Sequence, residues 1–332
     1  GGLDINSDAP GADRALTITS TGSTGMAVNV VADLYSSITI VQQDASTSIN
    51  VELVGDDTID IDGTADTVTL KSVVTSAADI AFDYDLTEAL KNLIVESVNT
   101  DAGAVTIESA NNLTINAAGL TAKGAIVIEA GNDITLGAGD GIAINTNTST
   151  ALVKLQADND GAGDGAIVDG GSLIAMTGGD LVLRAKTGIG TNGAKIETTG
   201  LVDFAAISTT GGIFLDNGTS GAINITTLDG VTGISTATSG NIGIINSAAA
   251  NIKVSSAIDA NRVGGTVTLN AGAALDIDAA ITAAGAIDLD AATNFDIDAT
   301  ITGGGNVELD TTGGTVDVAA ASRVIGGGDG TT

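Results

Sequence analysis

Hydrophobic and polar residues alternate in short runs along most of the chain, which is the periodicity of β-strands. The clearest part lies between residues 267 and 318. In successive lines it reads VTLNAGAALDIDAAITAAG, AIDLDAATNFDIDATITGGG and NVELDTTGGTVDV. The lines repeat after about 20 residues, and Gly and Ala fill the gaps between the runs, as turns require. Helix is disfavoured because Gly and β-branched residues are frequent and no helical period is present.

Equivalent positions of these lines carry similar apolar residues. A repeat of this length indicates supersecondary units that are too small to bury their own apolar face and therefore stack. Each unit holds three short apolar runs, so we predict an all-β fold, a parallel β-helix or β-solenoid with three short strands and about 20 residues per turn. The predicted core columns are Val267 over Ile287 over Val307, Leu269 over Leu289 over Leu309, Leu275 over Phe295, and Ile281 over Ile301.

We expect one continuous solenoid with two parts. Residues 103–332 carry the regular repeat, whereas residues 1–102 form an irregular N-terminal part of the same coil. In that N-terminal part, apolar runs two apart along the chain are separated by about 21 residues, close to the later period. The segment 158–171, DNDGAGDGAIVDGG, interrupts the repeat and predicts a loop between turns.

Residues 79–100 allow two interpretations. A short helix is supported by Asp85 and Glu88, which fit a capping box, and by apolar residues at helical spacing. These apolar residues are Leu86, Leu90, Leu93 and Ile94. The alternative, which we favour, is another turn of the coil with larger core residues. Asn residues also follow several strands, namely Asn145, Asn224, Asn246 and Asn270, and we attribute them to turn preference rather than to stacked ladders.

The composition fits a narrow core. The chain of 332 residues contains 46 Gly, four Phe, two Tyr and no Trp, and a thin stacked core is filled by Ile, Val, Leu and Ala. No apolar segment reaches the length that spans a membrane, so we predict no membrane insertion. The chain begins with Gly1 and shows no signal peptide, which we interpret as a processed protein or an excised segment.

The charge is strongly acidic. Asp and Glu number 41 against 11 Lys and Arg, which gives a net charge of −30. Nucleic acid is therefore excluded as an expected partner, because phosphate binding needs clustered cations, and anionic membrane surfaces are disfavoured for the same reason. The chain has no Cys and no His, which excludes disulfides, thiolate metal sites and Cys or His catalysis.

The strongest repeats place carboxylates in outward columns. Asp288 and Asp290 alternate with inward residues, and Glu308 and Asp310 occupy the same columns one turn later. Stacked turns bring these groups on the order of 5 Å apart, where like charges repel. Residues 263–322 contain no Lys or Arg, and oxygen clusters are what Ca²⁺ prefers. The predicted Ca²⁺ ligands are Asp276, Asp278, Asp288, Asp290, Asp296, Asp298, Glu308 and Asp310. The alternative is a solvated acidic face that is screened by salt.

The unit GAIDLDAATNFDIDATITGGG and its looser copies GAVTIESANNLTINAAGLTAKG and GAIVIEAGNDITLGAG resemble the repeats of filamentous haemagglutinin-like adhesins. The resemblance covers residues 103–328 well and the first hundred residues poorly. It implies a large, secreted, surface-exposed bacterial protein with a right-handed β-helical shaft. The secretion domain of that family is not recognisable here, and no adhesive residue carries over.

An enzyme is the less favoured class. Polysaccharide lyases and hydrolases also use parallel β-helices, and pairs such as Asp276 with Asp278 or Asp288 with Asp290 have the chemistry for glycoside hydrolysis. However, the pairs recur on successive turns, whereas a catalytic site is a single irregular constellation. We therefore predict no catalytic residue, no organic cofactor and no enzymatic activity.

The function we predict is structural: a rigid extracellular shaft of a cell-surface adhesin or filament. The alternative is a self-assembling extracellular filament subunit that stacks end to end through unpaired strand edges. A polysaccharide-acting enzyme ranks third. The expected partners are other copies of the chain, other surface proteins, and a ligand on a host or neighbouring cell.

Overall fold

The computed structural model describes residues 92–327, apart from 101–102, 110, 118, 138, 140, 147–148, 162–163, 219–220 and 248, together with the strand backbone between residues 2 and 84. These described residues form β-strands and no helix, and therefore include no helix that is long and apolar enough to cross a membrane. Contacts divide the chain into two compact units. Unit 1 comprises residues 1–165 and 170–175, and unit 2 comprises residues 166–169 and 176–332.

The N-terminal part of unit 1 has two strands per turn. Each strand pairs in parallel with the strand two places later in the chain, so that β1 pairs with β3, β2 with β4, and so on to β6 with β8. Three strands per turn were predicted, and this part departs from that number. The strands are β1 (Gly2–Asn6), β2 (Ala15–Ser20), β3 (Met26–Val31), β4 (Ser37–Gln42), β5 (Ser48–Val54), β6 (Thr58–Gly63), β7 (Thr67–Thr75) and β8 (Ile80–Tyr84).

The rest of unit 1 changes to three strands per turn. The long strand β7 pairs with β9 over one half and with β10 over the other, and from there each strand pairs with the strand three places later. These strands are β9 (Asn92–Val95), β10 (Val98–Thr100), β11 (Val105–Ser109), β12 (Asn112–Ile115), β13 (Leu120–Ala122), β14 (Ile126–Ala130), β15 (Ile134–Leu136), β16 (Gly141–Asn145) and β17 (Val153–Ala157).

Unit 2 begins with strands of very different length. They are β18 (Ala166–Asp169), β19 (Ser172–Ala185, whose first residues belong to unit 1), β20 (Gly188–Ile189), β21 (Ile196–Ser208), β22 (Ile213–Asn217), β23 (Ile223–Ile225) and β26 (Ile234–Thr236). A hairpin, β24 (Thr227–Leu228) with β25 (Val231–Thr232), forms the antiparallel pair between named strands of the described chain.

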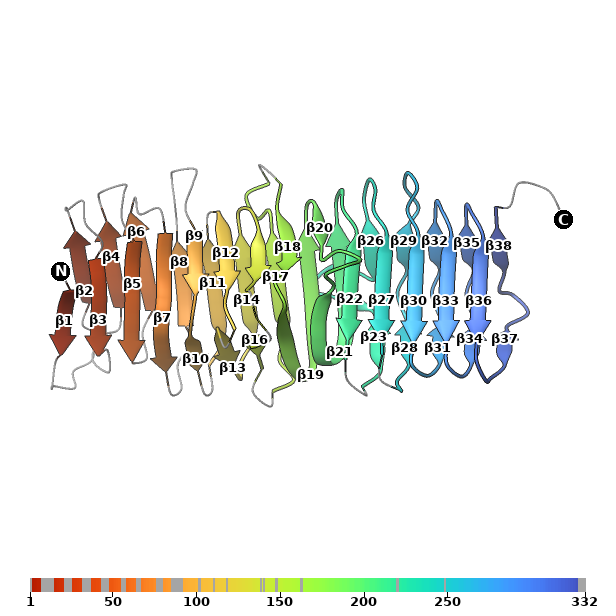
Figure 1. The fold of residues 1–332 in the computed structure, drawn as a ribbon, viewed down its shortest axis with the longest axis horizontal. Helices are drawn as coiled ribbons and strands as arrows, with labels where there is room; N and C mark the ends of the chain where they lie inside the picture. Colours follow the sequence, from red (N-terminus) through yellow and green to blue (C-terminus); the bar gives the residue numbers. More distant parts are fainter. Residues whose placement is uncertain are drawn as a thin grey trace. The chain divides into compact units, whose positions relative to one another are not determined.

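The end of unit 2 is the regular part. Its turns are β27 (Ile242–Asn246), β28 (Ile252–Val254) and β29 (Ile258–Ala260), then β30 (Val267–Ala271), β31 (Leu275–Ile277) and β32 (Ile281–Ala283), then β33 (Ile287–Ala291), β34 (Phe295–Ile297) and β35 (Ile301–Gly303), and finally β36 (Val307–Thr311), β37 (Val316–Val318) and β38 (Val324–Gly326). Figure 1 shows these strands stacked turn upon turn.

The parallel β-solenoid predicted from the sequence is confirmed. All four predicted core columns occur in the strand register, including Val267 beside Ile287 beside Val307, and Leu275 beside Phe295. The mean repeat is about 23 residues per turn, somewhat longer than the predicted value. The difference arises because the irregular turns carry longer loops: Asn217 and Asn246 stack on each other although they are 29 residues apart in the chain.

The two ambiguous segments have different outcomes. Leu93 and Ile94 lie in β9, and Leu93 is buried, so the strand interpretation is confirmed for residues 92–95. Leu86, Leu90 and the capping-box residues Asp85 and Glu88 lie outside the described residues. The prediction of a loop over residues 158–171 is wrong in part, because residues 166–169 form strand β18. This strand buries Ile167, which stands beside Ile189 of the next turn.

A buried polar column runs through the apolar core of unit 2. Thr198 donates to Asn217 Oδ1 at 3.2 Å, and Asn217 Nδ2 donates to Asn246 Oδ1 at 3.1 Å. Asn246 Nδ2 then donates to the backbone oxygens of Gly221 and Asn251 at 3.0 and 2.9 Å. Turn preference is therefore the wrong explanation for Asn246. A buried amide must find partners, and in-register stacking supplies the amide of the neighbouring turn.

Gly200 marks a corner inside the long strand β21. Its φ is +68°, and a Cβ at this position would lie 2.0 Å from the backbone oxygen of Met176. The residues before Gly200 pair with β22, whereas those after it pair with β23 and β26. A residue without a side chain is required here, because the chain turns from one face to the next while lying against the preceding turn.

The inward column at Ile287 gives a direct test of the fold. Ile287 is 1% exposed and stands between Val267 and Val307. We expect Ile287→Asp to lower the free energy of unfolding by roughly 3–5 kcal/mol, because an unpaired carboxylate enters the core. Ile287→Val should cost only about 0.5–1.5 kcal/mol, and Thr293→Asp on the exposed surface less than about 0.5 kcal/mol. Urea unfolding of the three variants measures these values, and similar losses for both Asp substitutions would contradict the inward assignment.

Candidate functional site

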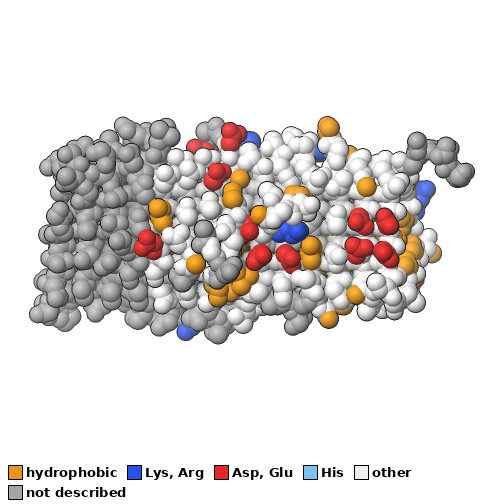
Figure 2. Space-filling model, in the orientation of Figure 1, with side chains coloured by type: hydrophobic (Ala, Val, Ile, Leu, Met, Phe, Trp, Pro, Cys, Tyr) orange, Lys and Arg blue, Asp and Glu red, His pale blue; other side chains and the backbone are white. Residues whose placement is uncertain are grey.

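The first acidic ladder lies on the face formed by β30, β33 and β36. Asp288 stands beside Glu308, and Asp290 stands beside Asp310, as predicted. Their neighbours along β33, Ile287 and Leu289, are buried, which leaves the carboxylates on the outer face. Figure 2 shows the resulting compact group of acidic side chains over the C-terminal strands of unit 2. The four predicted side chains are thus brought together.

The second acidic ladder follows β31, β34 and β37. Asp276 stands beside Asp296, and Asp296 stands beside Asp317 on the next turn. Asp278 and Asp298 follow the ends of their strands, and each donates its backbone N–H to the preceding turn. Sequence reasoning missed Asp317. The signal was present, because VDV at residues 316–318 repeats the pattern of FDI one turn earlier and of LDI two turns earlier.

Lys253 relieves the second ladder at its first turn. It stands beside Asp276 in the register, and its Nζ donates to Asp276 Oδ2 and to Asp278 Oδ2, both at 2.5 Å. Hydrogen bonds to both carboxylates raise the pKa of Lys253, and the hydrogen bond from Lys253 lowers the pKa of Asp278. The sequence predicts that no Lys or Arg relieves the acidic columns, since residues 263–322 contain none. This prediction is wrong for this turn, because Lys253 lies one turn earlier in the stack.

Two carboxylates that Lys253 does not contact, Asp290 and Asp296, have raised pKa values. Partial burial raises the pKa of Asp290, and the carboxylates of Asp288, Asp310 and Glu308 raise it further. Loss of hydration and the surrounding carboxylates likewise raise the pKa of Asp296. A raised pKa means that the folded state favours the protonated, neutral form. Asn270 offers limited relief, since its Nδ2 lies 3.4 Å from Asp290 Oδ2.

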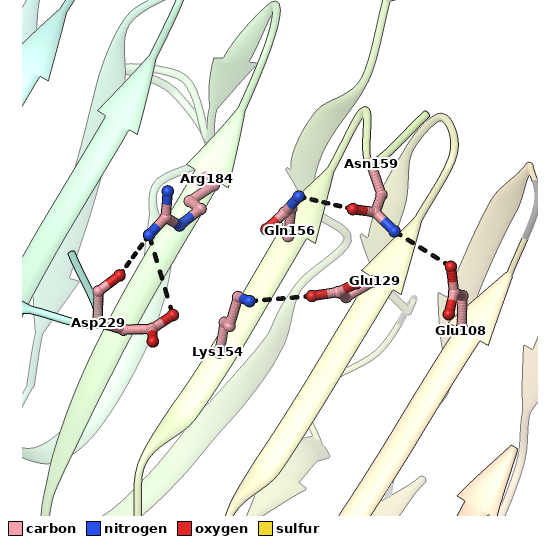
Figure 3. Close-up of polar contacts among 7 residues, drawn as sticks. All are labelled: Glu108, Glu129, Lys154, Gln156, Asn159, Arg184 and Asp229. Atoms are coloured by element: carbon pink, nitrogen blue, oxygen red, sulfur yellow. Dashed lines mark hydrogen bonds and ion pairs between the residues drawn. The ribbon is translucent and has the colours of Figure 1, made fainter. Parts of the chain in front are cut away.

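Unit 1 shows a compensated version of the same stacking. Glu108 stands beside Glu129 in the register, which again places two carboxylates on adjacent turns. Lys154 Nζ donates to Glu129 Oε1 at 2.9 Å, and Asn159 Nδ2 donates to Glu108 Oε1 at 3.2 Å. Gln156 in turn donates to Asn159 Oδ1 at 2.7 Å (Figure 3). Each of the two carboxylates therefore has its own donor.

Polar contacts at Arg184 and Asp203 are further examples in unit 2 that sequence reasoning missed. Arg184 Nη2 donates to the backbone oxygen of Asp229 and lies 3.9 Å from its Oδ2, which ties the β24–β25 hairpin to β19 (Figure 3). Asp203 accepts a hydrogen bond from Asn224 Nδ2 at 2.7 Å. Burial and the carboxylate of Asp203 raise the pKa of Asp180. No repeat pattern predicts these contacts, because they arise where the turns are irregular.

The geometry sets limits on what the acidic ladders could hold. In the described part of the chain, no three or more Asp, Glu, His or Cys side chains are grouped so that they could hold a metal ion. The ladder of β33 and β36 presents its carboxylates side by side on one face of a sheet, whereas Ca²⁺ takes six to eight surrounding oxygens. A Ca²⁺ ion at these residues would need most of its ligands from water. Calcium binding stays a prediction.

Comparison of the chain with protein-family models, with curated proteins and with solved structures finds no match.

The raised pKa of Asp290 predicts how stability depends on pH. A carboxyl whose folded pKa is above its unfolded value contributes stability when protonated and loses that contribution as the pH rises through the folded pKa. We therefore expect Asp290 to stabilise the fold as the pH falls from neutral toward 3.8, the ordinary pKa of Asp. At pH 7 we expect Asp290→Asn to raise the free energy of unfolding by roughly 0.5–1 kcal/mol and to flatten the acid part of the pH profile.

Lys253→Gln is the matched control, because it leaves Asp276 and Asp278 without their cation and should lower stability at neutral pH. Asp278 has the opposite sign to Asp290: its lowered pKa contributes stability that is lost as the pH falls. Thermal unfolding between pH 4 and 8 measures both variants. Superimposable pH profiles for the wild type and Asp290→Asn would contradict the assignment.

The second test concerns calcium. A cation that binds only the folded chain raises its stability in proportion to the logarithm of ligand concentration. The prediction is a higher unfolding temperature in millimolar Ca²⁺ than in EDTA at equal ionic strength, and loss of this difference in the double variant Asp288→Asn/Asp290→Asn. If the Ca²⁺ and EDTA curves coincide, the ladders are a solvated acidic face that responds only to screening.

Proposed function

We propose that this chain is a structural segment of an extracellular protein, the β-solenoid shaft of a cell-surface adhesin or filament. The observation that supports this proposal best is the parallel register, which continues from turn to turn through each unit. Backbone hydrogen bonds between turns then run along the stack, so that bending the stack requires many of them to stretch together. Such a segment resists deformation and serves as a spacer for whatever its ends carry.

The distribution of side chains also supports a structural role. Inward columns are almost wholly apolar, and the acidic residues of the regular turns face outward in repeating columns. A dense negative surface keeps neighbouring stacks apart and favours solubility in a medium that contains salt. The absence of His and Cys from the chain and the recurrence of the carboxylate pairs favour a non-enzymatic protein without an organic cofactor. The proposed partners are other surface proteins and a ligand on a neighbouring cell.

A second candidate, a subunit that stacks end to end into a filament, is favoured by the last described turn. The inward residues of this turn have no turn above them among the described residues, and Val316, Val318 and Val324 are 45%, 41% and 39% exposed. The corresponding residues one turn earlier, Phe295, Ile297 and Ile301, are buried. Among the described residues, this turn presents an apolar surface and strand edges without a further partner strand, which accept a further turn from a continuing chain or from another copy.

Particle size in solution separates the two candidates. For a shaft segment we expect monomers by sedimentation velocity at micromolar concentration and single particles by electron microscopy. For a filament subunit we expect fibres that lengthen with concentration. The double variant Val316→Lys/Val324→Lys places charges on the exposed edge and should abolish fibres without changing the sedimentation of the monomer.

An assay of polysaccharide cleavage tests the enzymatic alternative to a structural role. Release of reducing ends from a panel of neutral and acidic polysaccharides, lost on substitution of a single carboxylate pair, would contradict a structural role. Asp288→Asn/Asp290→Asn and Asp276→Asn/Asp278→Asn are the variants to compare. Loss of turnover in only one of them would mark a catalytic pair within the ladders.

A further inference from the structure

The outer face of unit 2 carries a hollow of about 160 Å³ where β22, β27 and β30 lie side by side. We call it the Phe214 hollow. Its lining includes Lys195, Phe214, Asn241, Ile245, Thr266 and Thr268. Pockets for drug-sized ligands are larger, about 300–1,000 Å³, so this hollow has room for a single small ring.

An aromatic ring forms part of this surface. Phe214 is half-buried on the outward side of β22, whereas Phe204 and Phe295, the other phenylalanines whose side chains the structure describes, are 0% and 1% exposed and belong to the core. In the register the residue beside Phe214 on the next turn is Gly243. A half-buried outward Phe leaves part of its ring surface in water, which a structural role alone does not require.

Two glycines keep the ring close to the sheet. A Cβ on Gly243 would lie 2.9 Å from Cδ1 of Phe214, and a Cβ on Gly212 would lie 2.4 Å from its Cε2. Neither glycine has a positive φ, so the reason for the missing side chain is space rather than backbone conformation. The Phe214 ring therefore occupies the volume that two side chains would fill and is held against the backbone of the neighbouring turn.

Polar groups surround the ring. Asn241 accepts the backbone N–H of Thr266 through Oδ1 at 3.1 Å, and its amide NH₂ has no acceptor among the described residues. Lys195 Nζ donates to the backbone oxygen of Asn192 at 2.9 Å and retains two further donor hydrogens. The Thr266 and Thr268 hydroxyls complete the set. Donors and hydroxyls around one aromatic ring match a ligand that has hydroxyl groups at its rim and C–H groups on its face.

The surrounding charge decides between ligand classes. Asp288 stands beside Thr268 on the next turn, and Asp216 stands beside Ile245, so carboxylates flank the hollow. A negative field of this kind disfavours anionic ligands. We propose that the Phe214 hollow binds a neutral pyranose ring of a glycan, whose C–H face packs on Phe214 because its polarised C–H groups face the negative π surface. The rim groups of Asn241, Lys195 and Thr268 bind the sugar hydroxyls.

The experiment uses the whole chain and methyl pyranosides of glucose, galactose and mannose as probes, with methyl glucuronoside as the charged counterpart. Saturation-transfer difference NMR detects weak binding and reports which face of the sugar is in contact. We expect transfer to the C–H protons of at least one neutral pyranoside, and at least a tenfold weaker affinity in Phe214→Leu, which keeps an apolar side chain but removes the ring.

Phe214→Trp provides a second measurement. The chain contains no Trp, so the new indole is the sole such fluorophore, and its emission should shift on titration with the same sugar. Thr293→Ala, on the surface of a different turn, is the matched control and should leave the affinity unchanged. Circular dichroism and unfolding temperature establish that each variant is folded.

Three results would overturn the proposal. They are no transfer to any neutral pyranoside from the folded wild type, equal transfer in Phe214→Leu, and preferential binding of the glucuronoside that Lys195→Gln abolishes. The last result would identify an anion site at Lys195 instead of a stacking site at Phe214. None of these outcomes depends on whether the chain is monomeric or fibrous, so this test is independent of the proposed shaft.

Discussion

In-register stacking of parallel strands is the constraint on which the rest of this structure depends. Each residue of a strand lies beside its equivalent on the next turn, at a spacing of about 4.8 Å. A side chain at such a position must therefore pack favourably against a similar side chain on the adjacent turn. Ile, Leu and Val meet this requirement readily, because their contact buries apolar surface on both sides. Val267, Ile287 and Val307 form such a column in unit 2.

Polar residues meet the same constraint in different ways. An amide can donate to the amide above and accept from the group below, so Asn217 and Asn246 can be buried in the core of unit 2. Two carboxylates can only repel. Asn159 donates a hydrogen bond to Glu108, and Lys154 donates one to Glu129. Lys253 donates one to Asp276. The repulsion is left largely unrelieved on the face of β33 and β36, where the pKa of Asp290 is raised.

The regular turns were predictable because a single rule generates them. Once the 20-residue spacing is found, the inward columns and the outward acidic pairs follow residue by residue. The irregular turns follow no such rule. Examples are the two-strand turns before Tyr84, strand β18 and the corner at Gly200. In each case the loop decides which earlier strand the next strand pairs with, and the length of the loop in the sequence does not specify this pairing. Lys253 was missed for a related reason: its distance to Asp276 is short in the stack and long in the chain.

The division between regular and irregular turns has a consequence for function. A solenoid fixes its inward residues, but an outward residue is constrained only by the two outward residues beside it. Where successive turns are equal in length, outward columns repeat, and the surface acquires a uniform property such as the acidity of β33 and β36. Where a turn is longer, as between Asn217 and Asn246, unlike residues come side by side, so that Phe214 stands beside Gly243 and then Thr268. The hollow with a mixed aromatic and polar lining lies at this break in the repeat. Specific recognition in this chain is therefore to be sought in its irregular turns, whereas its regular turns supply length, stiffness and charge.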